Sequence, residues 1–349
     1  MVTFSVDART FSELLADPAA AETLSAATGC PLVVVEIGSA ADGAHLSCPD
    51  AAIPAVVVVL SADPGWLPAA AFGAADVVLT EADDPRAPFV RPAAGVASGV
   101  SAISAALDRN PVAGTTLALL LRGSSALDVP SGLVAESATY SALQAGAEYG
   151  RWRASRPARS PEPETARVRV ERGDGELRIV LARPARRNAV DWRMRDDLVT
   201  ALALAAAEPG VRVVLDADGP DFCAGGDLDE FGSRPDPALA HLIRLTRSPA
   251  RLLSQLGDRT TAYLHGACLG AGIELPAFAA RVCAAEDTRI GLPEIELGLV
   301  PGAGGTVSLP RRIGRWRTAF LALTGQRVDA RLALRWGLVD AIEPVPASR

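Results

Sequence analysis

One stretch decides the fold of this chain: His265-Gly266-Ala267-Cys268-Leu269-Gly270-Ala271-Gly272-Ile273-Glu274. A short apolar segment typical of a buried strand, 260–264, precedes it, and apolar residues that indicate a helix follow the glycines. Small residues let a backbone N–H approach a ligand closely, and the first amides of a helix are unpaired donors at its positive end. A strand, a glycine loop and a helix in this order predict an α/β layer structure.

Two glutamates stand twenty positions apart (294 − 274 = 20) in unusual surroundings. Glu274 ends the run of small residues, and Glu294 lies inside the glycine-rich and apolar segment 291–306. A carboxylate among such residues is costly to desolvate, and desolvation raises its pKa. Two acids of this kind facing one cavity indicate a site that moves protons on and off a substrate.

A second glycine segment, 221–228, follows the predicted strand 211–215 after a short turn. Alone it would indicate an ordinary glycine turn. Together with the loop at Gly270 it offers backbone N–H groups from two separate loops. Such a pair of donors binds one carbonyl oxygen as that oxygen becomes an enolate or oxyanion.

Five motifs occur here in the order and spacing of a known family: Asn188-Ala-Val190, Phe222-Cys-Ala-Gly-Gly-Asp227, Gly270-Ala-Gly-Ile-Glu274, Pro293-Glu294 and Pro301-Gly-Ala-Gly-Gly-Thr306. Over about 167–343 the chain resembles the enoyl-CoA hydratase/isomerase (crotonase) superfamily. The resemblance implies an α/β fold with a ββα spiral core. It also implies a trimer, or a multiple of three chains.

The resemblance further implies which residues act. The backbone amides of Gly226 and Ala271 would form an oxyanion hole, and Glu274 and Glu294 would be the two catalytic carboxylates. Arg187 resembles a position at which a basic residue meets CoA phosphates, although a solvated surface arginine is an equal alternative. The substrate and CoA contacts that we predict are Arg187, Ala189, Ala224, Asp227, Leu228, Gly270, Pro293, Leu299 and Gly302.

The predicted activity is hydration of a 2-enoyl-CoA, or dehydration in reverse, because both acids are present. Enoyl-CoA isomerisation and acyl-CoA thioester hydrolysis are alternatives within the enzyme class. A non-catalytic acyl-CoA binding protein is the alternative of another class. We expect no cofactor beyond the coenzyme A of the substrate, and no metal, since the histidines and cysteines lack ligand spacing.

Composition limits the other possibilities. The chain has 349 residues, of which 49% are hydrophobic and 21% charged, which is typical of a globular protein with two domains. Its longest apolar runs are too short to span a bilayer, and no signal peptide is evident, so we expect a cytoplasmic protein without a membrane partner. No run of basic residues alternates with aromatic residues, which argues against the binding of nucleic acid. All 34 basic residues are arginine, so lysine chemistry is excluded.

The chain divides into three parts by composition. Residues 1–150 form a smaller α/β domain with strands at 32–36, 55–60 and 76–79, followed by long helices at about 95–107, 115–122 and 131–152. The Pro- and Arg-rich stretch 151–165 indicates a linker. Residues 166–349 form the catalytic domain, with a hairpin around Gly173-Asp174-Gly175, helices at 191–207, 318–324 and 329–336, and a helical segment 239–256 interrupted by Pro249.

The catalytic domain lacks the terminal helices that crotonases usually carry, because the chain stops at Arg349. The segment 133–152 resembles those helices, although it lies in the first half. The segment 75–81 also resembles 280–286, a register of 205 residues (280 − 75 = 205) that places Ala69 opposite Glu274. The first half is therefore predicted to be a degenerate, non-catalytic crotonase-like domain, with an unrelated α/β domain as the alternative.

Overall fold

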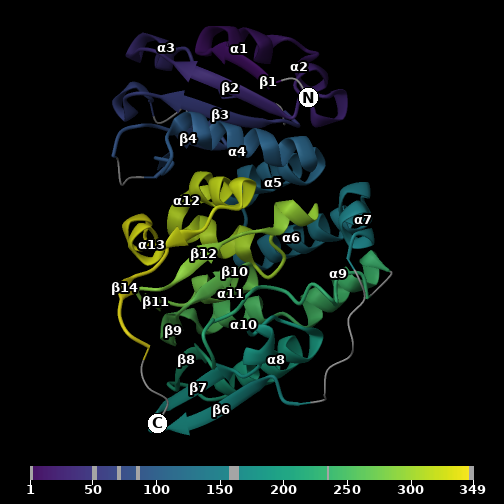
Figure 1. Cartoon of the computed structure of the whole chain (residues 1–349), viewed down its shortest axis with the longest axis vertical. Coiled ribbons are helices and arrows are strands. Elements are labelled where there is room, and N and C mark those ends of the chain that lie inside the picture. Colours follow the sequence, from purple (N-terminus) through teal and green to yellow (C-terminus); the bar gives the residue numbers. More distant parts are fainter. Residues whose placement is uncertain are drawn as a thin grey trace.

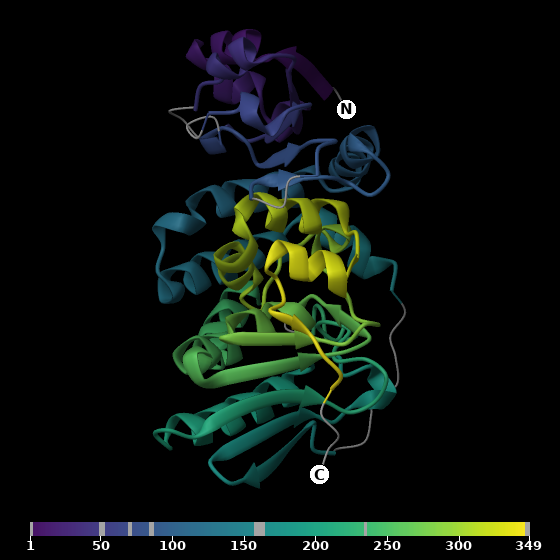
Figure 2. The same ribbon diagram turned by 90° about the vertical axis from the view of Figure 1, so that its left-hand side faces the viewer.

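The computed structural model describes residues 3–48, 53–68, 72–83, 87–156, 165–233 and 236–345. Its strands form three sheets, and a layer of helices lies between the first sheet and the other two (Figures 1 and 2). The first sheet belongs to the N-terminal part of the chain, and the other two belong to the C-terminal half. The molecule is thus an α/β structure, as predicted.

The first sheet holds five parallel strands in sequential order: β1 (Thr3–Asp7), β2 (Leu32–Ile37), β3 (Val56–Ser61), β4 (Val77–Leu79) and β5 (Phe89–Val90). The valine-rich β2 and β3 are buried on both faces, as expected for parallel strands covered by helices. Side chains alternate along a strand, so Val33 and Val57 pack toward Phe11 while Val34 and Val58 join the main core.

The helical layer combines both halves of the chain. It contains α4 (Val96–Arg109), α5 (Pro111–Gly123), α6 (Val129–Gln144) and α7 (Ala147–Ala154) from the first half, and α12 (Gly305–Thr324) from the second. Helix α12 packs against α4, α5 and α6. One apolar cluster therefore runs from Val58 through Leu117 and Leu321 to Leu264.

The C-terminal half builds two sheets. The larger has the order β14-β11-β9-β8-β7-β6, in which only the β6–β7 hairpin is antiparallel. Its strands are β6 (Val168–Gly173), β7 (Glu176–Leu181), β8 (Arg212–Ala217), β9 (Thr260–Leu264), β11 (Arg281–Ala284) and β14 (Ala341–Ile342). The smaller sheet pairs β10 (Ala267–Leu269), β12 (Arg289–Gly291) and β13 (Val328–Asp329).

Shorter elements connect these strands. The helices of the C-terminal half are α8 (Trp192–Ala206), α9 (Pro237–Thr246), α10 (Pro249–Leu256), α11 (Ala271–Glu274) and α13 (Ala330–Trp336). The first half adds α1 (Ala8–Ala16), α2 (Ala20–Thr23) and α3 (Ala40–Ala44). Single turns of tighter helix are η1 (Ala26–Thr28), η2 (Pro64–Trp66), η4 (Ser124–Ala126), η5 (Pro184–Arg186), η6 (Gly257–Arg259), η7 (Pro276–Phe278) and η8 (Glu294–Leu297). None of the helices in the described ranges has the length and apolar character needed to span a membrane.

Several sequence predictions are corrected at element boundaries. The helix predicted over 131–152 is two helices, because the chain breaks at Gly146 between α6 and α7. Arg151 to Ala154, predicted as linker, belong to α7, and residues 157–164 lie outside the described residues. The helix predicted over 318–324 is the second part of α12, which bends at Gly314 with φ 78° and ψ 156°. The domain limits at 150 and 166 stay predictions.

Candidate active site

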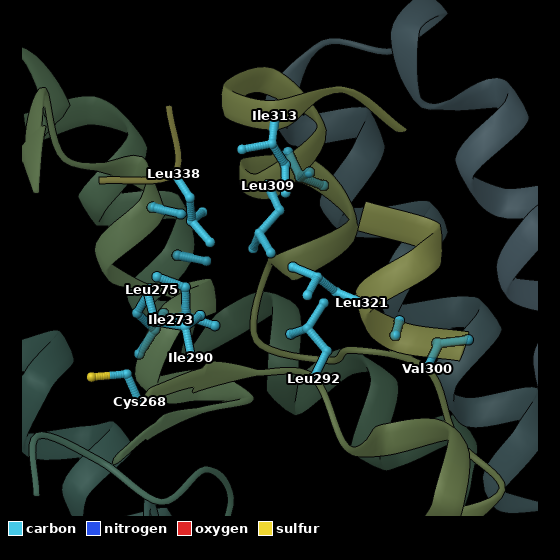
Figure 3. Packing of buried hydrophobic residues seen from close by; sticks show 14 of the residues in the cluster. Cys268, Ile273, Leu275, Ile290, Leu292, Val300, Leu309, Ile313, Leu321 and Leu338 are labelled. Atoms are coloured by element: carbon cyan, nitrogen blue, oxygen red, sulfur yellow. The ribbon is translucent and has the colours of Figure 1, made fainter. Parts of the chain in front are cut away.

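Glu274 ends α11, a helix of a single turn. Gly270 leads into it from β10 with φ 50° and ψ −121°, a conformation that residues with a Cβ rarely adopt. Ile273 and Leu275, on either side of Glu274, pack into the apolar core beside β12 (Figure 3). The helix is anchored by these neighbours, and the carboxylate of Glu274 is itself buried and lines a cavity.

The two glycine loops lie side by side. The Leu269 N–H donates to the Cys223 carbonyl at 2.9 Å, and a Cβ on Gly272 would collide with that same carbonyl. The amides of Gly226 and Ala271 donate no hydrogen bond to another group in the described parts of the chain, and both residues line one cavity. The close approach of the loops thus places two backbone N–H groups without a protein acceptor at the same site.

Glu274 is held by the loop that precedes α12. Its Oε2 accepts hydrogen bonds from the Ala303 N–H at 2.8 Å and the Gly305 N–H at 2.9 Å. Burial raises the pKa of Glu274 well above its ordinary value, and the charges of Glu294 and Glu136 raise it further. The two amides act in the opposite direction because they stabilise the ionised carboxylate.

Glu294 is held quite differently. It begins η8, and its buried Oε2 has no hydrogen-bond partner within the described ranges. Burial raises the pKa of Glu294 to about 8. A Cβ on Gly270 would collide with its Oε1, so this carboxylate lies against the turn that leads into α11. A buried oxygen without a partner at a cavity is a position where a substrate or water would supply the missing hydrogen bond.

A third carboxylate, Glu136, comes from α6 in the first half of the chain. It is 2% exposed and accepts hydrogen bonds from the Gly304 N–H at 2.7 Å, the Thr306 N–H at 2.8 Å and the Thr306 Oγ1 at 2.7 Å. Burial raises its pKa to about 7, against the effect of these donors. Two buried acids, Glu274 and Glu136, therefore bind the segment 303–306.

These groups meet at a cavity of about 650 Å³. Five predicted site residues line it: Gly226, Ala271, Glu274, Glu294 and Gly302. Residues 231–233 and several residues of 240–250 form much of the remaining wall, together with residues of α6. The predicted acids and amide donors thus share one enclosed space, although the chain separates Gly226 from Glu294 by 68 positions (294 − 226 = 68).

Eight other predicted contacts do not line this cavity: Arg187, Ala189, Ala224, Asp227, Leu228, Gly270, Pro293 and Leu299. The Arg187 side chain is 52% exposed and pairs with Asp221 at 2.6 Å. Asp227 is buried in an ion pair with Arg183 at 2.7 Å, and the Leu299 side chain is fully buried. The side chains of Asp227 and Leu299 are thus enclosed by protein, and the prediction that these residues contact a ligand stays a prediction.

Sequence reasoning did not single out four polar side chains that α6 and α9 contribute to the wall. Glu136, Ser137 and Tyr140 line the cavity, as does Arg244 of α9. Arg244 donates to the Ser137 Oγ at 3.0 Å, and its guanidinium lies 4.7 Å from the centre of the Tyr140 ring. One signal was present in the sequence: a single acid at position 136 stands among small and apolar residues of a predicted helix.

Aromatic side chains close the site over Gly226. Phe231 lies so near that a Cβ on Gly226 would come within 2.9 Å of its ring. The Phe231 ring packs edge-on against Trp152 of α7, with centroids 5.8 Å apart. Helices from the first half therefore cover this end of the cavity as well.

Among the described residues, no group of three or more His, Cys, Asp or Glu side chains is arranged to hold a metal ion. The five cysteines are all free. Besides Glu136, Glu274 and Glu294, the carboxylates of Asp191, Asp196 and Glu230 line the cavity.

Comparison with known proteins points to one family. The model of the enoyl-CoA hydratase/isomerase family matches residues 171–347. An enoyl-CoA isomerase/hydratase of Mycosarcoma maydis is 36% identical over 180 residues, which are 49% of this chain and 66% of that protein. The 2,3-dehydroadipyl-CoA hydratase of Escherichia coli (strain K12) is 37% identical over 178 residues, which are 50% of this chain and 68% of that protein.

Among solved structures, the enoyl-CoA hydratase from Thermoplasma volcanium GSS1 is 35% identical, with a TM-score of 0.48. The match covers 52% of this chain and 73% of that one. The chain spans about two thirds of the length of the two relatives described above.

Proposed function

Because the chain belongs to the enoyl-CoA hydratase/isomerase family, we propose that it is a hydratase that adds water across the 2,3 double bond of an enoyl-CoA, or removes it in reverse. One observation carries the proposal: Glu274 and Glu294 line the same cavity as the unpaired amides of Gly226 and Ala271. Hydration needs a base for water, an acid for Cα and donors for the enolate oxygen. The cavity has a group for each task.

The surroundings of the two acids suggest their roles. Burial raises the pKa of both acids, but Glu274 accepts two amide hydrogen bonds that favour its ionised form, and on this difference in hydrogen bonding we assign it as the base. Glu294 has an unpartnered oxygen and a pKa of about 8, so it holds a proton at neutral pH. In the proposed reaction Glu274 removes a proton from water, the hydroxyl oxygen bonds to Cβ, and Glu294 gives its proton to Cα.

The amides of Gly226 and Ala271 would stabilise the intermediate. As the C–O bond forms, the electrons of the double bond move toward the thioester and leave negative charge on its oxygen. Two N–H donors fixed by the protein backbone stabilise that charge without reorganisation. After protonation at Cα the thioester carbonyl is restored, and one water has been added. Glu274 then loses the proton it took and Glu294 regains one by exchange with water, which restores both acids.

Isomerisation is the second candidate, because one relative is named an isomerase/hydratase. An isomerase removes a proton from one carbon and returns it to another, for which one carboxylate can be enough. Thioester hydrolysis remains a further alternative. A non-catalytic acyl-CoA binding protein is the alternative outside the enzymes.

Turnover of crotonyl-CoA and of longer or aromatic enoyl-CoA substrates, followed as loss of the enoyl thioester absorbance, tests the proposal. Glu274→Gln and Glu294→Gln should each lower kcat by about 10²–10⁴-fold, since each removes one proton-transferring group. Glu296→Gln is the matched control because Glu296 lies two positions from Glu294 but is exposed. Equal activity of all three variants and the wild type would reject the roles of the two acids, and binding without turnover by the wild type would favour a binding protein.

The substrate, the number of chains in the assembly and the cellular location are parts of the same proposal. An acyl-CoA is the proposed substrate, and Arg187 is the proposed contact for its phosphates because its side chain is half exposed. An assembly of three chains, or a multiple of three, and a cytoplasmic location stay predictions.

A further inference from the structure

Glu136 lies in the first half of the chain, yet it is bonded to the segment that holds the proposed base. Its two oxygens accept from Gly304, from the Thr306 amide and from the Thr306 hydroxyl. Every one of these partners donates, so the site is built for an ionised carboxylate, which only accepts. The three bonds satisfy a side chain that is 2% exposed and would otherwise be costly to bury.

The amides of four consecutive residues are divided between two acids. Ala303 and Gly305 donate to Glu274, whereas Gly304 and Thr306 donate to Glu136. These residues surround the start of α12, where the first amides have no partner within the helix and the dipole favours negative charge. The donors to the two carboxylates alternate along one backbone. A shift of this segment that weakens the hydrogen bonds to one carboxylate therefore also displaces the donors to the other.

We propose that Glu136 is a positioning residue of the active site, which fixes the segment 303–306 so that its other two amides hold the carboxylate of Glu274 toward the substrate. The inference rests on the proposed function. It assigns to the first half of the chain a direct part in the chemistry of the second half, beyond covering the cavity.

Helix α6 is itself fixed in place next to Glu136. Arg244 of α9 donates to both the hydroxyl and the carbonyl of Ser137, the residue after Glu136. On another face of α6, Gly132 packs so closely that a Cβ there would come within 2.9 Å of Val307 in α12. A side chain on a helix held at both points can control the position of a neighbouring segment to a fraction of an ångström.

The charges around Glu136 decide the expected pH effect. Glu274 on α11 and Glu294 on η8 face the same cavity, and Tyr140 lies one turn further along α6. Arg244 of α9 is the cation whose charge acts on Glu136. The other charged residues that line the cavity are Asp191, Arg195, Asp196, Glu230 and Arg247. Negative charge on Glu136 raises the pKa of both Glu274 and Glu294. Its removal should therefore lower the pKa of Glu294. The pKa of Glu274 should fall less, because the displaced amides of Ala303 and Gly305 then stabilise its ionised form less well.

Glu136→Gln in the full chain tests the inference, with Glu148→Gln as the matched control. Glu148 is also a buried glutamate of the first half that accepts two backbone amides, from Val112 at 2.8 Å and Ala113 at 2.9 Å, but it does not line the cavity. Both variants replace a carboxylate that accepts hydrogen bonds from backbone amides by a neutral carboxamide, so both should lower the melting temperature. Only Glu136→Gln should lower kcat, by about 10²-fold for a misplaced catalytic group, with little change in KM.

Titration of isotope-labelled glutamate carboxyl groups by NMR supplies a readout that needs no turnover. A larger fall in the pKa of Glu294 than in that of Glu274 in Glu136→Gln, with neither changed in Glu148→Gln, would support the inference. Equal falls of both would show that Glu136 acts through its charge alone and would overturn the positioning role. Unchanged pKa values, or a kcat equal to that of the control, would overturn it. A wild type that hydrates no enoyl-CoA would reject the proposed function, while the titration would still decide whether Glu136 acts on Glu274.

Discussion

At the scale of single residues, the two proposed catalytic acids differ in what they bind. Glu274 accepts from two amides, whereas the buried Oε2 of Glu294 has no donor in the described parts of the chain. Leaving a buried polar atom unpaired costs about 1–3 kcal/mol, so such atoms persist where function requires them. The buried, unpaired Glu294 thus lowers the stability of the folded chain but can serve as a proton donor, and activity often has such a cost in stability.

The raised pKa of Glu294 predicts how the free energy of unfolding depends on pH. The pKa of Glu294 is raised by burial to about 8 in the folded chain, so the folded chain binds this proton more tightly than the unfolded chain does. The stabilisation that comes from this tighter proton binding is fully present below the unfolded pKa and is lost as pH rises through the folded value. Each such group lowers the free energy of unfolding by at most about 1.4 kcal/mol per pH unit in this window. Denaturant unfolding from pH 5 to 8 should therefore show a flatter decline for Glu294→Gln than for the wild type. Parallel declines would contradict the raised pKa.

At the scale of elements, α11 and the segment after Cys223 depend on close backbone contact. Gly272 touches the Cys223 carbonyl, and the neighbouring amide of Ala271 is a proposed oxyanion donor. The short helix is therefore positioned by the contact of two loops and by the packing of Ile273 and Leu275, rather than by its own length.

Gly272→Ala should separate the two loops. Overpacking of this kind costs about 1–3 kcal/mol, and displacement of one oxyanion donor lowers kcat by about 10²–10³-fold. Gly150→Ala in α7 is the control, because a Cβ there meets no atom within 4 Å. Thermal melts and kcat of the two variants provide the comparison. A Gly272→Ala variant with the kcat of the control would show that the loops tolerate the shift.

At the scale of the whole molecule, the helical layer joins the two halves. Asp76, in the loop before β4, is 1% exposed and binds one arginine from each half: Arg122 of α5 at 2.6 Å and Arg315 of α12 at 3.6 Å. Its Oδ2 also accepts from the Val57 N–H at 2.8 Å. The junction is thus an ionic network beside a continuous apolar core, so the halves are expected to unfold together.

Asp76→Asn should destabilise the whole chain. It leaves two arginines facing a neutral amide at a largely buried position, which costs about 3 kcal/mol when one partner of a buried pair is lost. Asp258→Asn, at an exposed position, is the control. Unfolding followed by tryptophan fluorescence should give one transition at lower denaturant. Two separate transitions would show that the halves are independent.

The origin of the first half stays a prediction, although its topology is informative. Its sheet has five parallel strands in sequential order, and β7, β8, β9, β11 and β14 are also parallel and sequential. The predicted register of 205 places Val56 of β3 at position 261 in β9 and Val77 of β4 at position 282 in β11. Ala69, the residue predicted to replace the acid, lies outside the described residues.

The sequence by itself determined the family, the α/β class and five residues of the second half that line the cavity. Glycines at 226, 270 and 272 and acids at 274 and 294 were recognisable because local backbone chemistry restricts which residues fit such loops. Most strands and helices were also predictable from apolar periodicity. The elements that were not predicted include β1 and α1 at the start of the chain, and the two- and three-residue strands of the small sheet, which are too short to show a period.

Only the tertiary structure decided what completes and tunes the site. Glu136 lies 138 positions before Glu274 (274 − 136 = 138), and no local pattern reports that both acids bind one backbone segment. The unpaired oxygen of Glu294 and the enclosed side chains of Asp227 and Leu299 were hidden for the same reason. Hydrogen bonding and burial at these positions depend on which helices pack over the loops, and packing between distant segments is not encoded in the spacing of neighbouring residues.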